Sequence, residues 1–168
     1  GNVPKYNVIA ARNDYVLRVI GNRQSSNKFL DIGCGTGELA IAAGKITTSS
    51  LGVDFAKEMI DICQTNAGAA EQDNVSFLCK SVFDADLPPG SFDIISANGV
   101  IEYISLAELD QLLELCIQLL APGGSLVLGS RNRLFNLYSL NAFTQEEIDL
   151  ETVHALLQES LAIVGGAS

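Results

Sequence analysis

Three alternating glycines directly after an apolar run constrain the fold of this chain more than any other feature. Residues 29–39 read Phe-Leu-Asp-Ile-Gly-Cys-Gly-Thr-Gly-Glu-Leu, and a stretch of helical character continues from Glu38 to Lys45. Glycine has no Cβ atom and adopts positive φ without strain, so it suits a tight turn whose backbone approaches a ligand closely. The segment therefore predicts a strand, a glycine turn and a helix in immediate succession.

Apolar runs alternate with helical periodicity along the next hundred residues, which favours a parallel sheet with crossover helices. A helix is expected over residues 6–21, and a Pro-Gly-Gly turn at 122–124 is expected to separate the last such helix from the last strand. The expected strands cover residues 29–32, 51–54, 75–79, 92–97 and 125–129. Two apolar stripes, expected to cover the sheet, predict the later helices: Met59, Ile60, Cys63 and Ala67, then Leu109, Leu112, Leu113, Cys116, Ile117 and Leu120.

The composition excludes several classes of protein. The chain has 168 residues, 48% of them hydrophobic and 18% charged, which suits one folded domain rather than a disordered chain. No apolar run is long enough to span a bilayer and no signal-peptide pattern is visible, so we expect a cytoplasmic protein without membrane contact. A net charge of −10 argues against a nucleic-acid partner. Four cysteines without a CxxC pair, and a single histidine, predict reduced core thiols and no metal site.

The glycine segment resembles motif I of the class I S-adenosylmethionine (SAM)-dependent methyltransferases. Residues 30–37, Leu-Asp-Ile-Gly-Cys-Gly-Thr-Gly, are similar almost letter for letter to the signature of the small-molecule type. The dehydrogenase fingerprint is Gly-x-Gly-x-x-Gly, and its third glycine position falls on Glu38 here. Asp31 would repel a pyrophosphate, whereas it suits the ammonium group of SAM. An NAD-dependent oxidoreductase is therefore the weaker alternative.

The resemblance covers about residues 25–130 and implies an α/β fold, a doubly wound Rossmann-like parallel sheet of order 3-2-1-4-5. Ligands of such sheets bind outside the carboxyl ends of the strands. The implied function is a SAM-dependent methyltransferase that moves a methyl group to a small-molecule acceptor by in-line displacement and releases S-adenosyl-L-homocysteine (AdoHcy). A second hypothesis is a non-catalytic SAM-binding module with a regulatory or scaffold role, because one acidic residue of the family pattern is missing.

The candidate cofactor residues lie where the expected strands end. The glycine turn supplies Asp31, Gly33, Cys34 and Gly35. Asp54 ends the second strand, where a carboxylate can accept hydrogen bonds from both ribose hydroxyls. Its alternative role is to cap the helix that starts near Ala56.

The adenine site is expected around the ends of the second and third strands. Phe55 and Met59 are placed beside the adenine ring. A core role is the alternative for each, and for Met59 the two roles fit equally well. Where this chain has Ser81, the family commonly has an acidic residue that accepts from the adenine amino group. Either Ser81 or Asp84 therefore supplies this contact, and the N–H of Val82 is expected to donate to the adenine ring.

Asn98 ends the fourth strand and is expected to line the methionine end of SAM and the entrance for the acceptor. Related small-molecule enzymes often carry histidine where Tyr103 falls, so no catalytic residue is assigned. Methyl transfer from a sulfonium is chiefly a positioning task, and a base is needed only for a weakly acidic hydroxyl. Arg131 and Arg133 are candidates either for holding an acidic acceptor or for a surface contact.

The pattern changes after residue 130. Residues 131–141 predict a loop with aromatic anchors, and the sequence Thr-Gln-Glu-Glu at 144–147 fits a capping box. The family usually adds a sixth strand and an antiparallel seventh, for which the remaining stretch is too short. We expect residues 1–168 to form one SAM-binding domain with five strands. Residues 131–168 would then be an insertion or a truncated end, and the fifth strand an exposed edge.

Overall fold

The computed structural model describes residues 8–23 and 27–130. The contacts divide the chain into two units, residues 1–130 and 131–168, and the fold below is that of the first. The predicted loop at 131–141, the capping box at 144–147, the two arginines at 131 and 133 and the question of further strands all lie outside the described residues.

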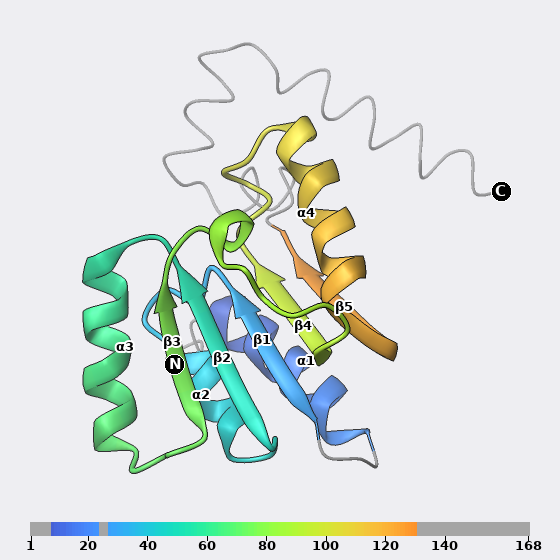
Figure 1. The fold of residues 1–168 in the computed structure, drawn as a ribbon. Coiled ribbons are helices and arrows are strands. Elements are labelled where there is room, and N and C mark those ends of the chain that lie inside the picture. The colour runs from blue at the N-terminus through green and yellow to red at the C-terminus, as the bar shows by residue number, and fades with distance from the viewer. Residues whose placement is uncertain (1–7, 24–26, 131–168) are drawn as a thin grey trace, which may run out of the picture. The chain divides into compact units, whose positions relative to one another are not determined.

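Five parallel strands form one sheet in the order β3-β2-β1-β4-β5 (Figure 1). The predicted strand order is thereby confirmed, and every predicted strand is present. Because all five strands run the same way, their carboxyl ends lie along one edge of the sheet. The order reverses between β1 and β4, so this edge holds the switch point. The strands are β1 (Lys28–Ile32), β2 (Ser49–Asp54), β3 (Val75–Cys79), β4 (Phe92–Asn98) and β5 (Leu120–Gly129).

Helices cover both faces of the sheet, as the doubly wound prediction requires. Two of them, α1 (Val8–Gly21) and α2 (Glu38–Gly44), lie together behind the sheet in Figure 1, and α3 (Lys57–Ala69) lies beside β3. On the opposite face α4 (Leu106–Leu119) begins with a capping box between Ser105 and Glu108. A one-turn 3₁₀ helix, η1 (Val82–Asp84), follows β3 and was not predicted.

The core consists of two main apolar clusters, one on each face of the sheet. Successive residues of β1 serve the two faces in turn: Phe29 packs with α1 and α2, and Leu30 packs with α4, both fully buried. A strand buried on both faces reads as a continuous apolar run, which is why β1 was visible in the sequence. The cluster on the α1 face comprises Val16, Ile20, Phe29, Leu39, Ala43, Ile94 and Val127.

The start of β5 differs from the prediction. The strand begins at Leu120, directly after α4, and the register with β4 jumps from Phe92–Leu120 to Ile94–Ser125. Residues 121–124 therefore form a bulge at the start of β5, with Gly123 at a φ of +75°, rather than a turn ahead of it.

Two expectations about buried residues were wrong. Ile117, placed on the apolar stripe of α4, is 72% exposed, and Leu119 packs in the core instead. The prediction assumes the ideal helical period of about 3.6 residues up to the end of α4. The chain turns into β5 there, so the period does not give the buried side at Ile117. Cys79 is exposed at the end of β3, whereas Cys34, Cys63 and Cys116 are buried as expected.

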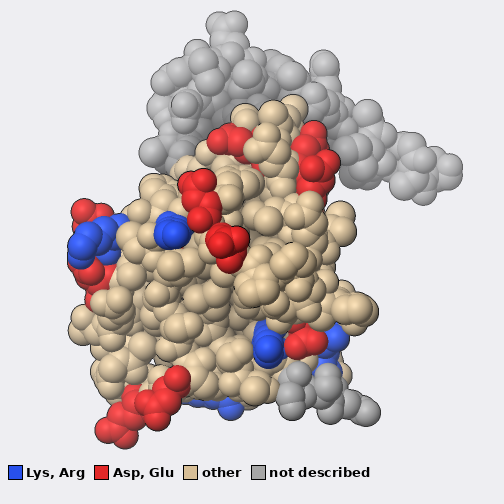
Figure 2. Space-filling view, viewed as in Figure 1, with Lys and Arg blue, Asp and Glu red and all other residues tan. Residues whose placement is uncertain are grey.

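The charge of the surface and the length of the helices are relevant to binding of nucleic acid and of membranes. Figure 2 shows acidic side chains at several places on one face, with fewer basic side chains between them and no broad basic patch. This face offers little to a phosphate backbone, in keeping with the net charge of −10. In the part of the chain that the structure describes, no helix combines the length and apolarity that crossing a bilayer requires.

The packing of α4 predicts a contrast between two leucines of that helix. Leu112 is fully buried and Leu106 is 82% exposed. Leu112→Ala should lower the free energy of unfolding by about 2–5 kcal/mol, because it leaves a cavity beneath the helix. Leu106→Ala should change it by less than about 0.5 kcal/mol. Urea denaturation measures both, and equal losses would show that α4 does not pack as described.

Candidate functional site

The carboxyl edge of the sheet brings the predicted cofactor residues together (Figure 1). The glycine turn follows β1, Asp54 is the last residue of β2, and Asn98 is the last residue of β4. Val82 begins η1, just after β3. These positions come from four segments distant in sequence, so the edge is a composite site built by the strand order.

Backbone hydrogen bonds tie the glycine turn to the end of β2. The N–H groups of Gly33 and Cys34 both donate to the carbonyl of Val53, at 2.8 and 3.1 Å. The N–H of Gly35 donates to Asp54 Oδ2 at 3.0 Å. From α3, the thiol of Cys63 donates to the carbonyl of Gly35 at 3.0 Å. The turn is therefore held on two sides and its conformation is set before any ligand arrives.

The glycines of the turn serve different purposes. Gly35 has a φ of +52°, and a Cβ atom placed on it would meet nothing within 4 Å, so it borders open space. Gly37 has a φ of +80°, and its Cβ would lie 2.9 Å from Cys63 Sγ and 3.0 Å from the Phe77 ring. Gly37 is thus required by packing, whereas Gly35 leaves free the room that a ligand would occupy.

Asp31 is a buried carboxyl beneath this turn. It is 3% exposed and pairs in register with Gly52 on β2 and Ser96 on β4. Burial raises the pKa of Asp31 to about 7, a shift that Ser96 opposes and the charge of Asp54 reinforces. Among the described residues the hydroxyl of Ser96 makes no hydrogen bond of ordinary geometry, and no salt bridge reaches Asp31. A buried carboxyl without a cation is suited to a cationic ligand.

Both carboxylate oxygens of Asp54 accept a hydrogen bond from a backbone N–H group. Its Oδ2 accepts from Gly35 and its Oδ1 accepts from the N–H of Ala56 at 2.9 Å. The second contact matches the alternative prediction of a role at the start of α3, although the cap position itself is occupied by Ala56. An ionised carboxylate has about four acceptor positions, so two remain for a ligand diol.

The expected adenine residues surround the ends of β2 and β3. Phe55 is 80% exposed and Met59 is 37% exposed, so both offer apolar surface outside the sheet edge. Ser81 precedes η1, and its Oγ accepts from the N–H of Phe83 at 3.4 Å. Val82 is buried, and its N–H lies at the start of a helix, where backbone donors have no intrahelical partner.

Asn98 lies beside an arginine that was not predicted as a site residue. Among the described residues its amide nitrogen is buried without a hydrogen-bond partner. Arg12 of α1 reaches over the same edge and pairs with Glu102, with 3.5 Å between Nη2 and Oε1. A cavity of about 220 Å³ adjoins both, lined by Ala11, Arg12, Tyr15, Asn98, Val127, Leu128 and Gly129. Arg12 stands one turn before the buried Val16 of α1, but its spacing within the helix does not distinguish it as a site residue.

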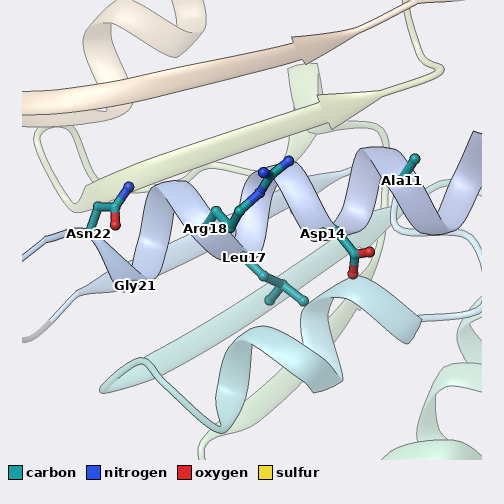
Figure 3. Close-up of a pocket in the computed structure, with 6 residues that line it drawn as sticks. All are labelled: Ala11, Asp14, Leu17, Arg18, Gly21 and Asn22. Carbon is teal, nitrogen blue, oxygen red and sulfur yellow. The ribbon is translucent and has the colours of Figure 1, made fainter.

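A larger hollow of about 790 Å³ runs along α1 (Figure 3). In the close-up, Asp14 and Leu17 point to one side of the helix and Arg18 to the other. None of the predicted cofactor residues lines it, so its size does not make it the functional site. The six lining residues shown are Ala11, Asp14, Leu17, Arg18, Gly21 and Asn22.

A family model described as "Methyltransferase domain" matches residues 29–124, from the start of the glycine motif to the bulge of β5. The chain belongs to this methyltransferase family. The match covers the glycine turn, Asp54, Val82 and Asn98, and it confirms the family predicted from the glycine motif.

Three individual proteins illustrate what this methyltransferase domain is similar to. An uncharacterised protein of Rickettsia prowazekii is 38% identical over 117 residues, covering 64% of this chain and 47% of the relative. The mitochondrial ubiquinone biosynthesis O-methyltransferase of Mus musculus is 31% identical over 131 residues, covering 76% and 35%. The structure of PKMT2 from Rickettsia typhi in complex with AdoHcy has a TM-score of 0.59 at 34% identity, covering 67% and 24%. The chain thus spans about half the length, or less, of the curated relatives it matches.

Metal chemistry has no evident centre in the described part of the methyltransferase domain. Within residues 8–23 and 27–130, no group of three or more His, Cys, Asp or Glu side chains is placed to hold a metal ion. The polar groups at the carboxyl edge include Asp31, Asp54, Arg12 and the backbone of the glycine turn.

Burial of Asp31 predicts a pH dependence of stability. Its folded pKa of about 7 lies above the ordinary value of 3.8, so folding takes up a proton between these values and stability falls as the pH rises through this window. Asp31→Asn should remove this fall and stabilise the ligand-free domain at pH 8 by on the order of 2–4 kcal/mol.

The matched control is Asp61→Asn, because Asp61 is an exposed acid paired with Lys57 on α3. It should shift the free energy of unfolding by less than about 0.5 kcal/mol at any pH. Denaturation between pH 5 and 8 measures the three proteins. Parallel pH curves for wild type and Asp31→Asn would show that Asp31 does not titrate in this range.

Proposed function

We propose that this domain binds SAM across the carboxyl edge of the sheet and transfers its methyl group to a small-molecule acceptor. The observation that carries the proposal is Asp31, a buried carboxyl two residues before the glycine turn, with no salt bridge among the described residues. The names of the relatives, among them ubiquinone biosynthesis O-methyltransferase and a protein complexed with AdoHcy, support a SAM cofactor and a small acceptor.

The ammonium group of SAM is the natural partner of Asp31. A cation within a few ångströms favours the ionised carboxylate and offsets the cost of burying it. The pKa of Asp31 is raised by burial in the ligand-free domain, so SAM binding should pull it down again. Gly35 provides the space for the amino-acid end, because its Cβ position is open.

The ribose of SAM fits the remaining acceptor positions of Asp54. The other two acceptor positions already accept from the N–H groups of Gly35 and Ala56, which holds the carboxylate in place at the end of β2. Two hydrogen bonds from a diol to an ionised carboxylate stabilise binding more than two hydrogen bonds between neutral groups. We assign Asp54 to the ribose on this ground.

For adenine we propose the apolar surface of Phe55 and Met59, with a hydrogen bond from the N–H of Val82. Ser81 already caps η1 with its Oγ as acceptor, so its hydroxyl hydrogen is still available as a donor. A serine can donate to a ring nitrogen, whereas the acidic residue common in the family would accept from the exocyclic amine. The polarity of this contact is therefore reversed at position 81.

At the opposite end of the cofactor, Arg12, which was not predicted, joins Asn98, which was predicted to line the methionine end, as a second donor. The Arg12–Glu102 distance of 3.5 Å is long for a charge-assisted hydrogen bond, so the guanidinium retains donors for an anion. The amide nitrogen of Asn98, which has no hydrogen-bond partner within residues 8–23 and 27–130, adds a donor close by. We propose that these two groups receive a carboxylate at the methionine end of the site.

SAM supplies a methyl group on a sulfonium, which needs a nucleophile in line rather than an acid to expel the leaving group. The protein must therefore hold the nucleophile in line with the bond between sulfur and the methyl group. Tyr103 is 78% exposed and Glu102 pairs with Arg12, so neither is held as a general base would be. An acceptor that loses its proton easily, or is already nucleophilic, suits such a site.

Variants of two glycines distinguish an effect on cofactor binding from an effect on the stability of the domain. Gly35 and Gly90 both have positive φ, +52° and +64°, and a Cβ on either would meet nothing within 4 Å. Alanine at either position should cost about 1 kcal/mol of stability through backbone strain. Only Gly35→Ala should weaken AdoHcy binding, by about tenfold or more, since its methyl group enters the ligand space.

Calorimetry with AdoHcy, and with NAD as the negative ligand, measures this effect. Equal affinity of the two alanine variants for AdoHcy would show that the cofactor does not lie against Gly35. Transfer of tritium from methyl-labelled SAM into small molecules of a cell extract then distinguishes an enzyme from a binding module. AdoHcy binding without any transfer would favour the non-catalytic alternative.

A further inference from the structure

Two cysteine thiols meet directly beneath the glycine turn. Cys34 lies within the turn and Cys63 lies on α3, and their sulfur atoms are 4.0 Å apart although 29 residues separate them in sequence. Both side chains are buried, at 8% and 0% exposure, in a small cluster with Ile60 and Phe77. The other two free cysteines, Cys79 and Cys116, are not part of this cluster.

Hydrogen bonds and packing connect the two cysteines to the proposed cofactor site. The Cys63 thiol donates to the carbonyl of Gly35, whose N–H in turn donates to Asp54. Gly37 packs so closely on Cys63 that even a methyl group there would lie 2.9 Å from its sulfur. A movement of Cys63 toward Cys34 therefore breaks one contact of the turn and disturbs the packing of another.

We propose that Cys34 and Cys63 form a modification site, at which a peroxide joins them in a disulfide that displaces the glycine turn and prevents SAM binding. A disulfide requires a sulfur separation of about 2.05 Å, so the sulfurs must approach by about 2 Å. The inference rests on the proposed function, because it concerns control of the same site.

The chemistry needs one hydrogen peroxide molecule. Cys34, the more exposed of the two, loses its proton, and its sulfur attacks one peroxide oxygen. The O–O bond breaks, giving a sulfenic acid and a hydroxide that takes up the released proton to become water. Cys63 then loses its proton, and its sulfur attacks the sulfenic sulfur and expels a second hydroxide, which becomes water with that proton. Two S–H bonds are lost, one S–S bond is formed, and peroxide is reduced to two waters.

The environment of the two thiols determines when peroxide can oxidise them. Burial raises the pKa of both thiols, and the negative charges of Asp31 and Asp54 add to the rise, so the thiolate is scarce while the turn stays closed. Oxidation therefore requires the turn to open locally. A bound cofactor would lie over Gly35 and hold the turn in place, so the ligand-free domain should be oxidised and the loaded domain protected.

The test treats the reduced domain with hydrogen peroxide, with and without AdoHcy, and follows it by intact mass, peptide mapping and calorimetry. We expect a mass lower by two hydrogen atoms, a peptide linking Cys34 to Cys63, and AdoHcy binding at least about tenfold weaker. Thiol reduction should restore binding, and AdoHcy should slow the mass change. Absence of the linked peptide from the folded domain, or a linked domain that binds as before, would overturn the proposal.

Two serine variants assign the effect to the pair. Cys63→Ser retains a hydroxyl that can donate to Gly35 but cannot form the disulfide. Peroxide should at most add oxygen to Cys34 in this variant, and after mild thiol treatment that reduces a sulfenic acid its AdoHcy affinity should equal that before peroxide. Cys79→Ser removes the exposed thiol near the proposed adenine site and should still lose binding on oxidation, as wild type does. The opposite pattern would trace the effect to Cys79 and contradict the proposal. Failure of the reduced wild type to bind AdoHcy would instead refute the proposed function, while the mass measurement still tests the pair.

Discussion

Three hydrogen bonds from the glycine turn to the end of β2 are the constraint on which the rest of the site depends. Val53 accepts two of them through its carbonyl and Asp54 accepts the third through its carboxylate. They form because β1 and β2 are parallel and in a register that pairs Ile32 with Val53. Sheet register thus sets the position of the turn, and the turn sets where Gly35 is open and where Asp54 can face a ligand.

The same geometry carries a cost in the ligand-free domain. Asp31 is buried beneath the turn and Asp54 lies close enough to raise its pKa further, with no salt bridge to offset either charge among the described residues. A structure selected only for stability would place an apolar residue or a cation there. The buried carboxyl is therefore best explained by a cationic ligand, and the stability lost without it is expected at a functional site.

Much of the fold could be predicted from local patterns, because buried parallel strands are continuous apolar runs and the glycine turn has a distinctive sequence. Features set by tertiary contacts could not: the bulge that lets β5 begin at Leu120, the exposure of Ile117 and Cys79, and the helix η1. Arg12 was missed because its role depends on α1 crossing the edge above Asn98, which no spacing within α1 reveals. The Cys34–Cys63 contact likewise exists only because α3 packs under the turn.

The central claim is that the carboxyl of Asp31 receives the ammonium group of the cofactor. Calorimetry of AdoHcy binding at pH 7, in buffers that differ in ionisation enthalpy, counts the protons exchanged on binding. With a pKa of about 7 the carboxyl is partly protonated in the ligand-free domain, so binding should release a measurable fraction of a proton per cofactor, and Asp31→Asn should abolish the release. An apparent enthalpy independent of buffer in the wild type, or equal proton release in both proteins, would contradict the account.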